Sequence, residues 1–109
     1  AAAQDCGQTA GSRMKSVRAI LRKEFPISRR VVVSFGECED GNAAETWMDG
    51  GTIRICIDDT LSPSSVRHML CHEWAHARLF DRAGRACTRH SVAWAMEYAA
   101  IYERIFGNE

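Results

Sequence analysis

Apolar side chains recur every three to four residues in three stretches of the chain, the spacing that gathers them on one face of a helix. The three stretches are residues 12–25, 62–80 and 88–106. Ser12 and Ser62 are candidate N-terminal caps, and Pro63 fits the first position of the second helix, where its missing N–H does no harm. Pro26 ends the first helix and Gly107 ends the last. The pattern predicts three helices.

Between the first two helices the pattern changes to the alternation and β-branching of strands. Residues 30–35 form a β-branched run, residues 44–48 predict a second short strand, and Gly50 and Gly51 mark a turn before a third. In residues 52–57 isoleucines alternate with Thr, Arg and Cys, as in a strand with one buried and one polar side. We predict an α+β domain in which an N-terminal helix and a small, mostly antiparallel sheet cover the central helix, and a C-terminal helix closes over it.

Composition and charge limit the classes of protein to consider. The chain has 109 residues, 46% of them hydrophobic and 26% charged, which fits one small globular domain. Its 14 basic and 14 acidic residues cancel, so the overall charge favours neither nucleic acid nor a membrane surface. No apolar run reaches the ~20 residues of a membrane helix. Residues 1–11 have few side chains that can pack, so we expect a flexible arm there and a single domain over residues 12–109.

The cysteines bear on the compartment. The chain has five of them, an odd number, and no C-x-x-C pair. At least one thiol is therefore free, which weakens the case for a secreted disulfide framework and favours a reducing, cytoplasmic compartment. The chain begins Ala1-Ala2-Ala3 without methionine. Such a start can come from a cleaved signal site, another kind of processing or a vector remnant, so secretion remains an alternative.

The second predicted helix contains His72-Glu73-Trp74-Ala75-His76, an H-E-x-x-H motif. Residues four apart lie one above the other on a helix, so His72 and His76 can direct two imidazole nitrogens at one metal ion. Glu73 is about 100° further round the helix, too far for a third ligand but close enough to hold a metal-bound water. A metal that acidifies water beside a carboxylate that takes its proton is the arrangement of a metal-assisted hydrolase.

A catalytic zinc site needs a third protein ligand, and the sequence offers three candidates. His90 and Glu97 are two turns apart on one face of the last predicted helix, so only one can reach the metal. We favour His90, which lies beside the turn that returns the chain to the motif. Glu97 has the spacing of glutamate-liganded zinc proteases, but Ile101 stands where these usually have an acid, and a salt bridge is its alternative role. Cys38 is the third candidate, because peptide deformylases combine an upstream cysteine with H-E-x-x-H.

Three further residues lie on the predicted helices near the motif. His68 is on the same helical row as the motif histidines, and we expect it to be exposed rather than to line the cleft. Tyr98 and Tyr102 are candidates for stabilising an oxyanion, with packing of the last helix as the alternative role for both.

The segment from about residue 45 to residue 106 contains an extended pattern around the motif. The pattern is Gly51-x-Ile53-x-Ile55, Leu61, Val66-x-x-x-Leu70-x-His72-Glu73-x-x-His76-Ala77 and His90-x-x-x-Trp94. It resembles the SprT-like group of small zinc metalloproteases. The resemblance implies a minimal zincin-like domain, one zinc ion per chain on His72, His76 and His90, and Glu73 as general base. The chain departs from the group at Ser91, where a glycine commonly follows the third histidine, and it lacks the paired cysteines of a C-terminal zinc ribbon.

These observations predict a zinc-dependent metallopeptidase in which Glu73 takes the proton of a zinc-activated water. The alternatives are a deformylase-like zinc amidohydrolase and a zinc-binding regulatory or nucleic-acid-associated domain without turnover, the last resting on the basic residues of the first helix. We expect a peptide or protein substrate and no membrane partner. Because the strand over Thr52–Ile57 precedes the motif and has a polar side, we expect it to be the sheet edge along the cleft, where an extended peptide binds.

Overall fold

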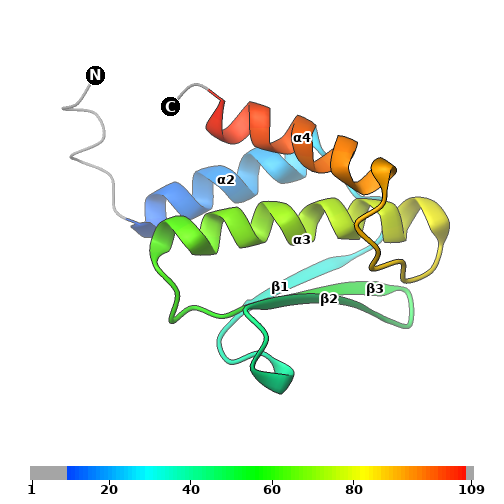
Figure 1. Cartoon of the computed structure of the whole chain (residues 1–109), viewed down its shortest axis with the longest axis horizontal. Coiled ribbons are helices and arrows are strands. Elements are labelled where there is room, and N and C mark those ends of the chain that lie inside the picture. The colour runs from blue at the N-terminus through cyan, green and yellow to red at the C-terminus, as the bar shows by residue number, and fades with distance from the viewer. Residues whose placement is uncertain (1–9, 108–109) are drawn as a thin grey trace.

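The computed structural model describes residues 10–107, so the arm predicted for residues 1–11 lies almost entirely outside the described residues. The elements follow the order α2 (Ala10–Glu24), β1 (Val31–Phe35), η1 (Glu39–Gly41), β2 (Ala44–Asp49), β3 (Thr52–Ile57), α3 (Pro63–Ala83) and α4 (Val92–Phe106). Among these residues the three α-helices lie on one face of a three-stranded sheet (Figure 1). The predicted α+β class and the order of helices and strands are confirmed.

The helix ends differ in detail from the prediction. α2 begins at Ala10, two residues before the predicted Ser12 cap, so the predicted border between arm and domain falls inside a helix. Alanine is the best helix former, so Ala10 suits the first turn of this helix. α3 begins as predicted, because the Ser62 side chain accepts a hydrogen bond from the amide three residues on and Pro63 takes the first position. It ends at Gly84, whose φ of 70° is in the left-handed region that favours glycine.

The sheet has the strand order β1-β3-β2 and is mixed. β2 and β3 form an antiparallel hairpin through the predicted turn, whereas β1 pairs with β3 in parallel. The expectation that Thr52–Ile57 is the edge strand is therefore wrong, since β3 is the central strand and pairs on both sides. The alternation of apolar and polar residues reports which face of a strand is buried, and it carries no information about which strands flank it. The edges are β1 and β2.

The core lies between the sheet and the helices. The fully buried side chains include Leu21 of α2, Ile53, Ile55 and Ile57 of β3, Leu70 and Phe80 of α3, and Ile101 of α4. The isoleucines of β3 are thus buried as the alternation predicted. α3 lies against the sheet, with α2 and α4 on its other side (Figure 1). No helix in the described part of the chain is long and apolar enough to cross a membrane.

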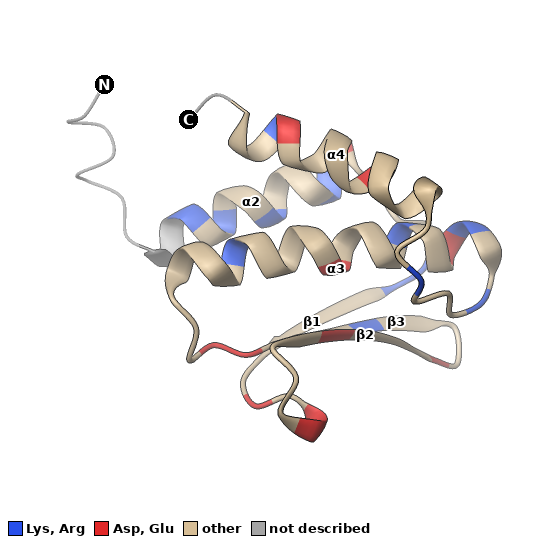
Figure 2. Ribbon diagram, in the orientation of Figure 1, with Lys and Arg blue, Asp and Glu red and all other residues tan. Residues whose placement is uncertain are grey.

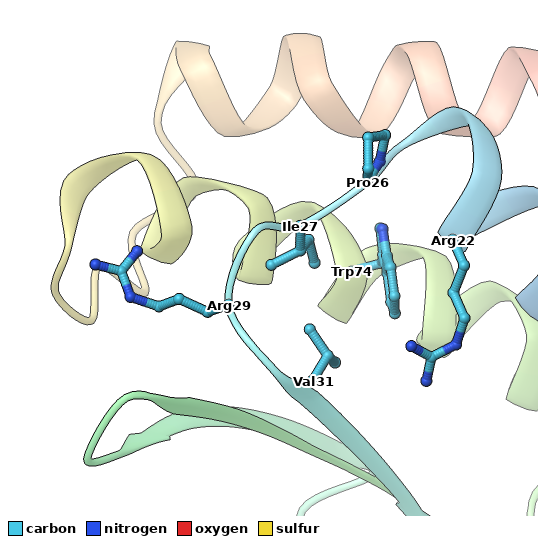
Figure 3. Close-up of a pocket in the computed structure, with 6 residues that line it drawn as sticks. All are labelled: Arg22, Pro26, Ile27, Arg29, Val31 and Trp74. Carbon is cyan, nitrogen blue, oxygen red and sulfur yellow. The ribbon is translucent and has the colours of Figure 1, made fainter.

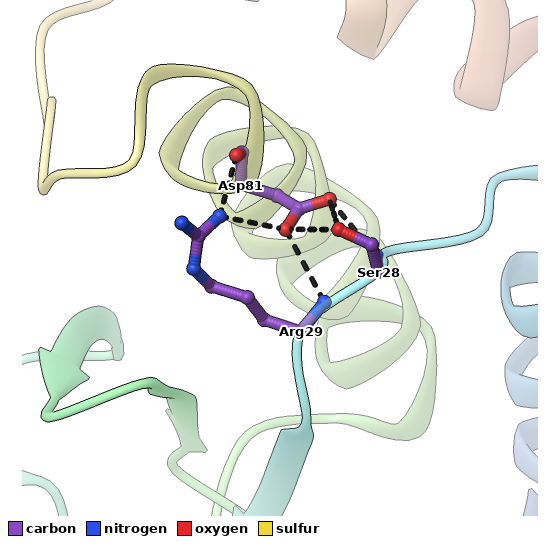
Figure 4. A network of polar contacts seen from close by, with 3 residues as sticks. All are labelled: Ser28, Arg29 and Asp81. Atoms are coloured by element: carbon purple, nitrogen blue, oxygen red, sulfur yellow. Dashed lines mark hydrogen bonds and ion pairs between the residues drawn. The ribbon is translucent and has the colours of Figure 1, made fainter.

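Asp81, near the end of α3, binds the connection between α2 and β1 (Figure 4). The amides of Ser28 and Arg29 donate to its carboxylate at 2.9 and 3.2 Å, and the Ser28 hydroxyl donates at 2.8 Å. Arg29 adds an ion pair at 3.0 Å and a hydrogen bond to the Asp81 carbonyl at 2.6 Å. Burial alone would raise the pKa of Asp81, but the hydrogen bonds outweigh it and the pKa is lowered. This network fixes the far end of α3 against the first strand.

We predict that Asp81→Asn lowers the free energy of unfolding at neutral pH by about 1–3 kcal/mol, because the amide cannot accept the same set of hydrogen bonds. The folded pKa of Asp81 is lowered, so the carboxylate's contribution is present above the unfolded pKa of about 3.9 and is lost as pH falls through the folded value. Urea unfolding of both proteins at a series of pH values measures this. The difference in stability between them should shrink below about pH 4.

The matched control is Asp59→Asn, which changes an exposed aspartate in the loop before α3. Its stability should stay within about 0.5 kcal/mol of the parent protein. A stability difference for Asp81→Asn that remained constant down to acid pH would contradict the assigned role of the carboxylate.

Candidate metal centre

Three histidines from two segments meet beside the sheet. His72 and His76 lie one turn apart on α3, and His90 lies in the connection that leads into α4. The ring centroids are 5.1 Å apart for His72 and His76, 5.1 Å for His72 and His90, and 5.0 Å for His76 and His90. Each ring offers one nitrogen, and the three nitrogens lie within 4.8 Å of one another. The structure thus brings the three predicted ligands together in a group that could hold a metal ion.

The protonation of these imidazoles suits metal binding. Burial, helped by the neighbouring His90, lowers the pKa of His72. Burial and the other two histidines lower the pKa of His76 to about 4. Nδ1 of His76 is buried and has no hydrogen-bond partner among the described residues. Near neutral pH these two rings are therefore neutral, the form in which an imidazole donates a lone pair to a metal.

The start of α4 holds His90 in place. α4 begins after Ser91, whose hydroxyl accepts a hydrogen bond from the Trp94 amide at 3.2 Å, and not near Thr88 as predicted. Trp94 then packs against all three imidazoles, with centroid distances from 4.4 to 5.2 Å, and its indole N–H donates to the His72 carbonyl at 3.4 Å. His90 is therefore positioned by a capped helix start and an aromatic neighbour rather than by the regular geometry of a helix.

Glu73 lies beside the histidine group without being part of it. Its side chain is 7% exposed, and its Oε2 is 3.7 Å from Nε2 of His72. The hydroxyl of Thr46 on β2 donates to Oε1 at 2.8 Å. Burial raises the pKa of Glu73, and the hydrogen bond from Thr46 opposes this shift without cancelling it. The predicted geometry of a carboxylate next to, but outside, the ligand set is present.

Thr46 is a residue that the sequence analysis missed. Side chains alternate along β2, and Ala44 and Met48 pack against the core, so Thr46 between them turns toward α3. A polar residue at an inward position of a strand was the available signal. Its partner could not be identified before β2 was known to lie against the motif helix.

A cleft of about 300 Å³ opens beside the histidines. The chain just before and within β2 contributes Asn42, Ala44, Glu45 and Thr46, and the opposite side consists of His72, Glu73, His76, Thr88 and His90. β2 is an edge strand, so the N–H and C=O groups on its outer side have no strand partner among the described residues. The cleft therefore combines three imidazoles, a carboxylate and an edge strand.

The two other candidate ligands lie elsewhere. Glu97 forms ion pairs with two arginines of α3, Arg78 and Arg82, the second at 2.5 Å. This is the salt-bridge role given as its alternative. Cys38 contacts Cys56 of β3, with their sulfur atoms 2.6 Å apart. Among the described residues, neither belongs to the group that could hold a metal.

His68 and the two tyrosines of α4 differ in their distance from the site. The His68 ring stacks on Phe106 with centroids 4.0 Å apart, and Tyr102 packs beside it at 5.8 Å. Both are therefore packing residues at the far end of the helices. The Tyr98 ring is 5.6 Å from that of His72, and burial raises the pKa of its hydroxyl. Of these three residues, Tyr98 is the one that contacts the histidine group.

Trp74, inside the motif, faces away from the histidines and anchors the other side of α3. Its indole N–H donates to the Phe25 carbonyl at 2.9 Å. Its ring lines a small cavity of about 90 Å³, together with residues of α2, of the connection that follows it and of the start of β1 (Figure 3). Because Trp74 and the motif histidines project from the same two turns, burial of the indole fixes the rotation of α3 that directs His72 and His76 into the cleft.

Comparison with family models, curated proteins and solved structures gives no match. The site itself is therefore the basis for inferring a function. Its elements are three close imidazoles, a buried carboxylate one residue along from the first of them, and an adjoining cleft.

We predict that His90→Ala weakens binding of a divalent metal far more than Glu97→Gln does. Loss of a direct ligand should lower the metal affinity by more than the about 10–100-fold expected for loss of a carboxylate outside the ligand set. Affinities can be measured by competition with a chromophoric chelator, using Co²⁺ so that the visible spectrum also reports the ligands. His68→Ala is the matched control, since it removes another imidazole of α3 outside the group. Equal affinities of the His90→Ala and parent proteins would rule out this ligand set.

Proposed function

We propose that this chain is a zinc-dependent metallopeptidase similar to the SprT-like group, in which His72, His76 and His90 bind one zinc ion. One observation carries the proposal: three imidazoles converge next to the buried carboxylate of Glu73 in a cleft bordered by an edge strand. These are the groups that metal-assisted hydrolysis of a peptide bond requires.

The donor set and its spacing suit a zinc ion. Three imidazoles are a known ligand set of catalytic zinc sites and leave a fourth position for water. Two nitrogens at about 2.0–2.1 Å from a tetrahedral zinc would be about 3.3–3.4 Å apart. Nε2 of His72 and Nε2 of His90 are 3.2 Å apart. A zinc ion fits between them with little movement of either ring.

The residues of the chain have separate parts in the reaction. A bound zinc ion lowers the pKa of its water to about 7 and polarises the scissile carbonyl. Glu73 accepts the proton of the attacking water and passes it to the leaving amine. The Thr46 hydroxyl holds Oε1 of Glu73, which leaves Oε2 on the side of His72 to take the proton. Trp94 restricts the motion of the three imidazoles by packing against each of them.

We place the substrate along β2 instead of β3. β2 lines the cleft and is an edge strand, so an extended peptide can pair with its backbone, whereas β3 has no unpaired side. Backbone pairing reads little of the side chains. The proposed enzyme therefore prefers flexible or unfolded segments to a strict sequence motif.

The alternatives have less support. Figure 2 shows basic residues along α2, the feature that suggested nucleic-acid binding. Arg18 of this helix lies over the ring of Phe35, and Arg22 lies over the ring of Trp74, each 5.8 Å from the ring centroid. Two of the positive charges of α2 are therefore in contact with aromatic rings of the same chain. A deformylase-like ligand set is not favoured, because Cys38 is outside the histidine group.

We predict that Glu73→Gln keeps zinc and the fold but lowers kcat/KM on a flexible peptide by about 10²-fold or more, because the amide cannot accept the proton. The assay is cleavage of a fluorogenic peptide library, with zinc content measured on the same samples. Glu45→Gln, which changes another carboxylate of the cleft, is the control and should retain most of the activity. Unimpaired cleavage by Glu73→Gln would exclude this mechanism.

We predict that Thr46→Val lowers kcat by about tenfold through loss of a single hydrogen bond to Glu73, with KM and zinc affinity nearly unchanged. Valine keeps the shape of threonine and removes only the hydroxyl. Thr46→Ser restores the hydroxyl and should recover most of kcat. A Thr46→Ser enzyme as slow as Thr46→Val, or a loss that appears in KM alone, would show that Thr46 does not position the base.

A further inference from the structure

The face of the sheet turned away from the helices carries a pair of neighbouring cysteines. Cys56 lies between Ile55 and Ile57 on β3, so the alternation of the strand directs it away from the core that these isoleucines fill. The loop of residues 36–43, which joins β1 to β2, brings Cys38 onto this face and against Cys56. Cys38 and Cys56 are 5% and 7% exposed, and neither belongs to the main core.

The two sulfur atoms are close enough to react with each other. Their separation is 2.6 Å, and the Cys38 thiol donates a hydrogen bond to the Cys56 sulfur. This separation is about half an ångström more than the ~2.05 Å of a disulfide bond. Bond formation therefore requires only a small movement of the two sulfur atoms.

We propose that Cys38 and Cys56 are a redox modification site, at which a low-molecular-weight disulfide oxidises the pair to an intramolecular disulfide. The Cys56 thiolate attacks one sulfur of the small disulfide and displaces the other as a thiolate, giving a mixed disulfide. The Cys38 thiolate then attacks the Cys56 sulfur and displaces the remaining half. The two cysteines lose two electrons and two protons, and the small disulfide gains them as two thiols.

The access of Cys56 to a cavity and the high pKa of Cys38 indicate that Cys56 reacts first. Cys56 borders a cavity of about 430 Å³ on the outer side of the sheet, whose other lining residues are Ser34, Glu37, Glu39, Glu45 and Trp47. Burial, followed by the hydrogen bond to Cys56, raises the pKa of the Cys38 thiol to about 12, so Cys38 forms little of the thiolate that the first attack needs. Three glutamates around the cavity favour a cationic reagent over an anionic one. Cystamine, a small disulfide with two amines, therefore suits the site better than glutathione disulfide.

The disulfide would affect the wall of the metal cleft. The loop that carries Cys38 leads directly into β2, and Asn42 and Ala44 at this junction line the cleft beside the histidines. A covalent link from Cys38 to the central strand would hold this junction against β3. The modification would thus restrict the side of the cleft on which the proposed substrate strand lies.

The test uses the full chain, reduced, freed of reductant and treated with cystamine. Remaining thiols are alkylated, and the protein is digested with trypsin. Trypsin cuts after Arg30, Arg54 and Arg67, so Cys38 and Cys56 fall in the separate peptides 31–54 and 55–67. We expect these two peptides to be recovered joined, with a mass two hydrogens below their sum. Under equal concentrations the reaction should be slower with glutathione disulfide.

Thermal unfolding gives a second readout. Closing this loop should raise Tm by on the order of 10 °C, because it restricts the unfolded chain. Cys38→Ser should abolish both the joined peptides and the Tm increase, while Cys87→Ser, outside the pair, should leave them unchanged.

Three outcomes would overturn the proposal: a stable cystamine adduct on Cys56 with Cys38 alkylated, a link from either cysteine to another one, or no reaction of either. If Cys38→Ser fails to fold, the peptide map of the parent chain decides alone. None of these readouts depends on peptidase activity, so a negative result here would leave the proposed function standing.

Discussion

The site depends on the rotation of one buried helix. α3 lies between the sheet and the other two helices, and its period directs Leu70 and Trp74 into the fold while His72 and His76 face the cleft. The rotation is fixed at two points. Trp74 is held by the Phe25 carbonyl, and Asp81 is held by the chain that enters β1. Any turn of α3 that moved the histidines would expose the indole and break the Asp81 network, so the imidazoles are oriented before a metal binds.

Three elements then complete the site around this helix. The connection to α4 supplies His90, with Trp94 packed against all three rings. β2 supplies Thr46, which holds one oxygen of Glu73 and couples the edge strand to the carboxylate. Under the proposed function, this cleft has separate parts for binding a metal, moving a proton and receiving an extended peptide. β2 contributes to the second through Thr46 and to the third as the edge strand of the cleft.

Local patterns predicted the helices, the strands and the three histidines, because helical and strand periods are properties of neighbouring residues. Spacing alone placed His72 and His76 on one row. His90 was favoured over Glu97 because it lies beside the turn that returns the chain to the motif. The strand order could not be predicted, because the alternation along Thr52–Ile57 indicates which face of the strand is buried and not which strands pair with it. For the same reason, the sequence could not predict the role of Thr46, the arginine partners of Glu97 or the contact of Cys38 with Cys56. Each of these depends on segments that only the tertiary fold brings together.

We propose that the three histidines hold one zinc ion. Crystals of the chain grown with zinc, with diffraction data collected on both sides of the zinc absorption edge, test it directly. We expect a single anomalous peak about 2.0–2.1 Å from one nitrogen each of His72, His76 and His90. A peak bound by Glu97 or Cys38, or no peak among the three imidazoles in a structure that otherwise keeps this fold, would contradict it.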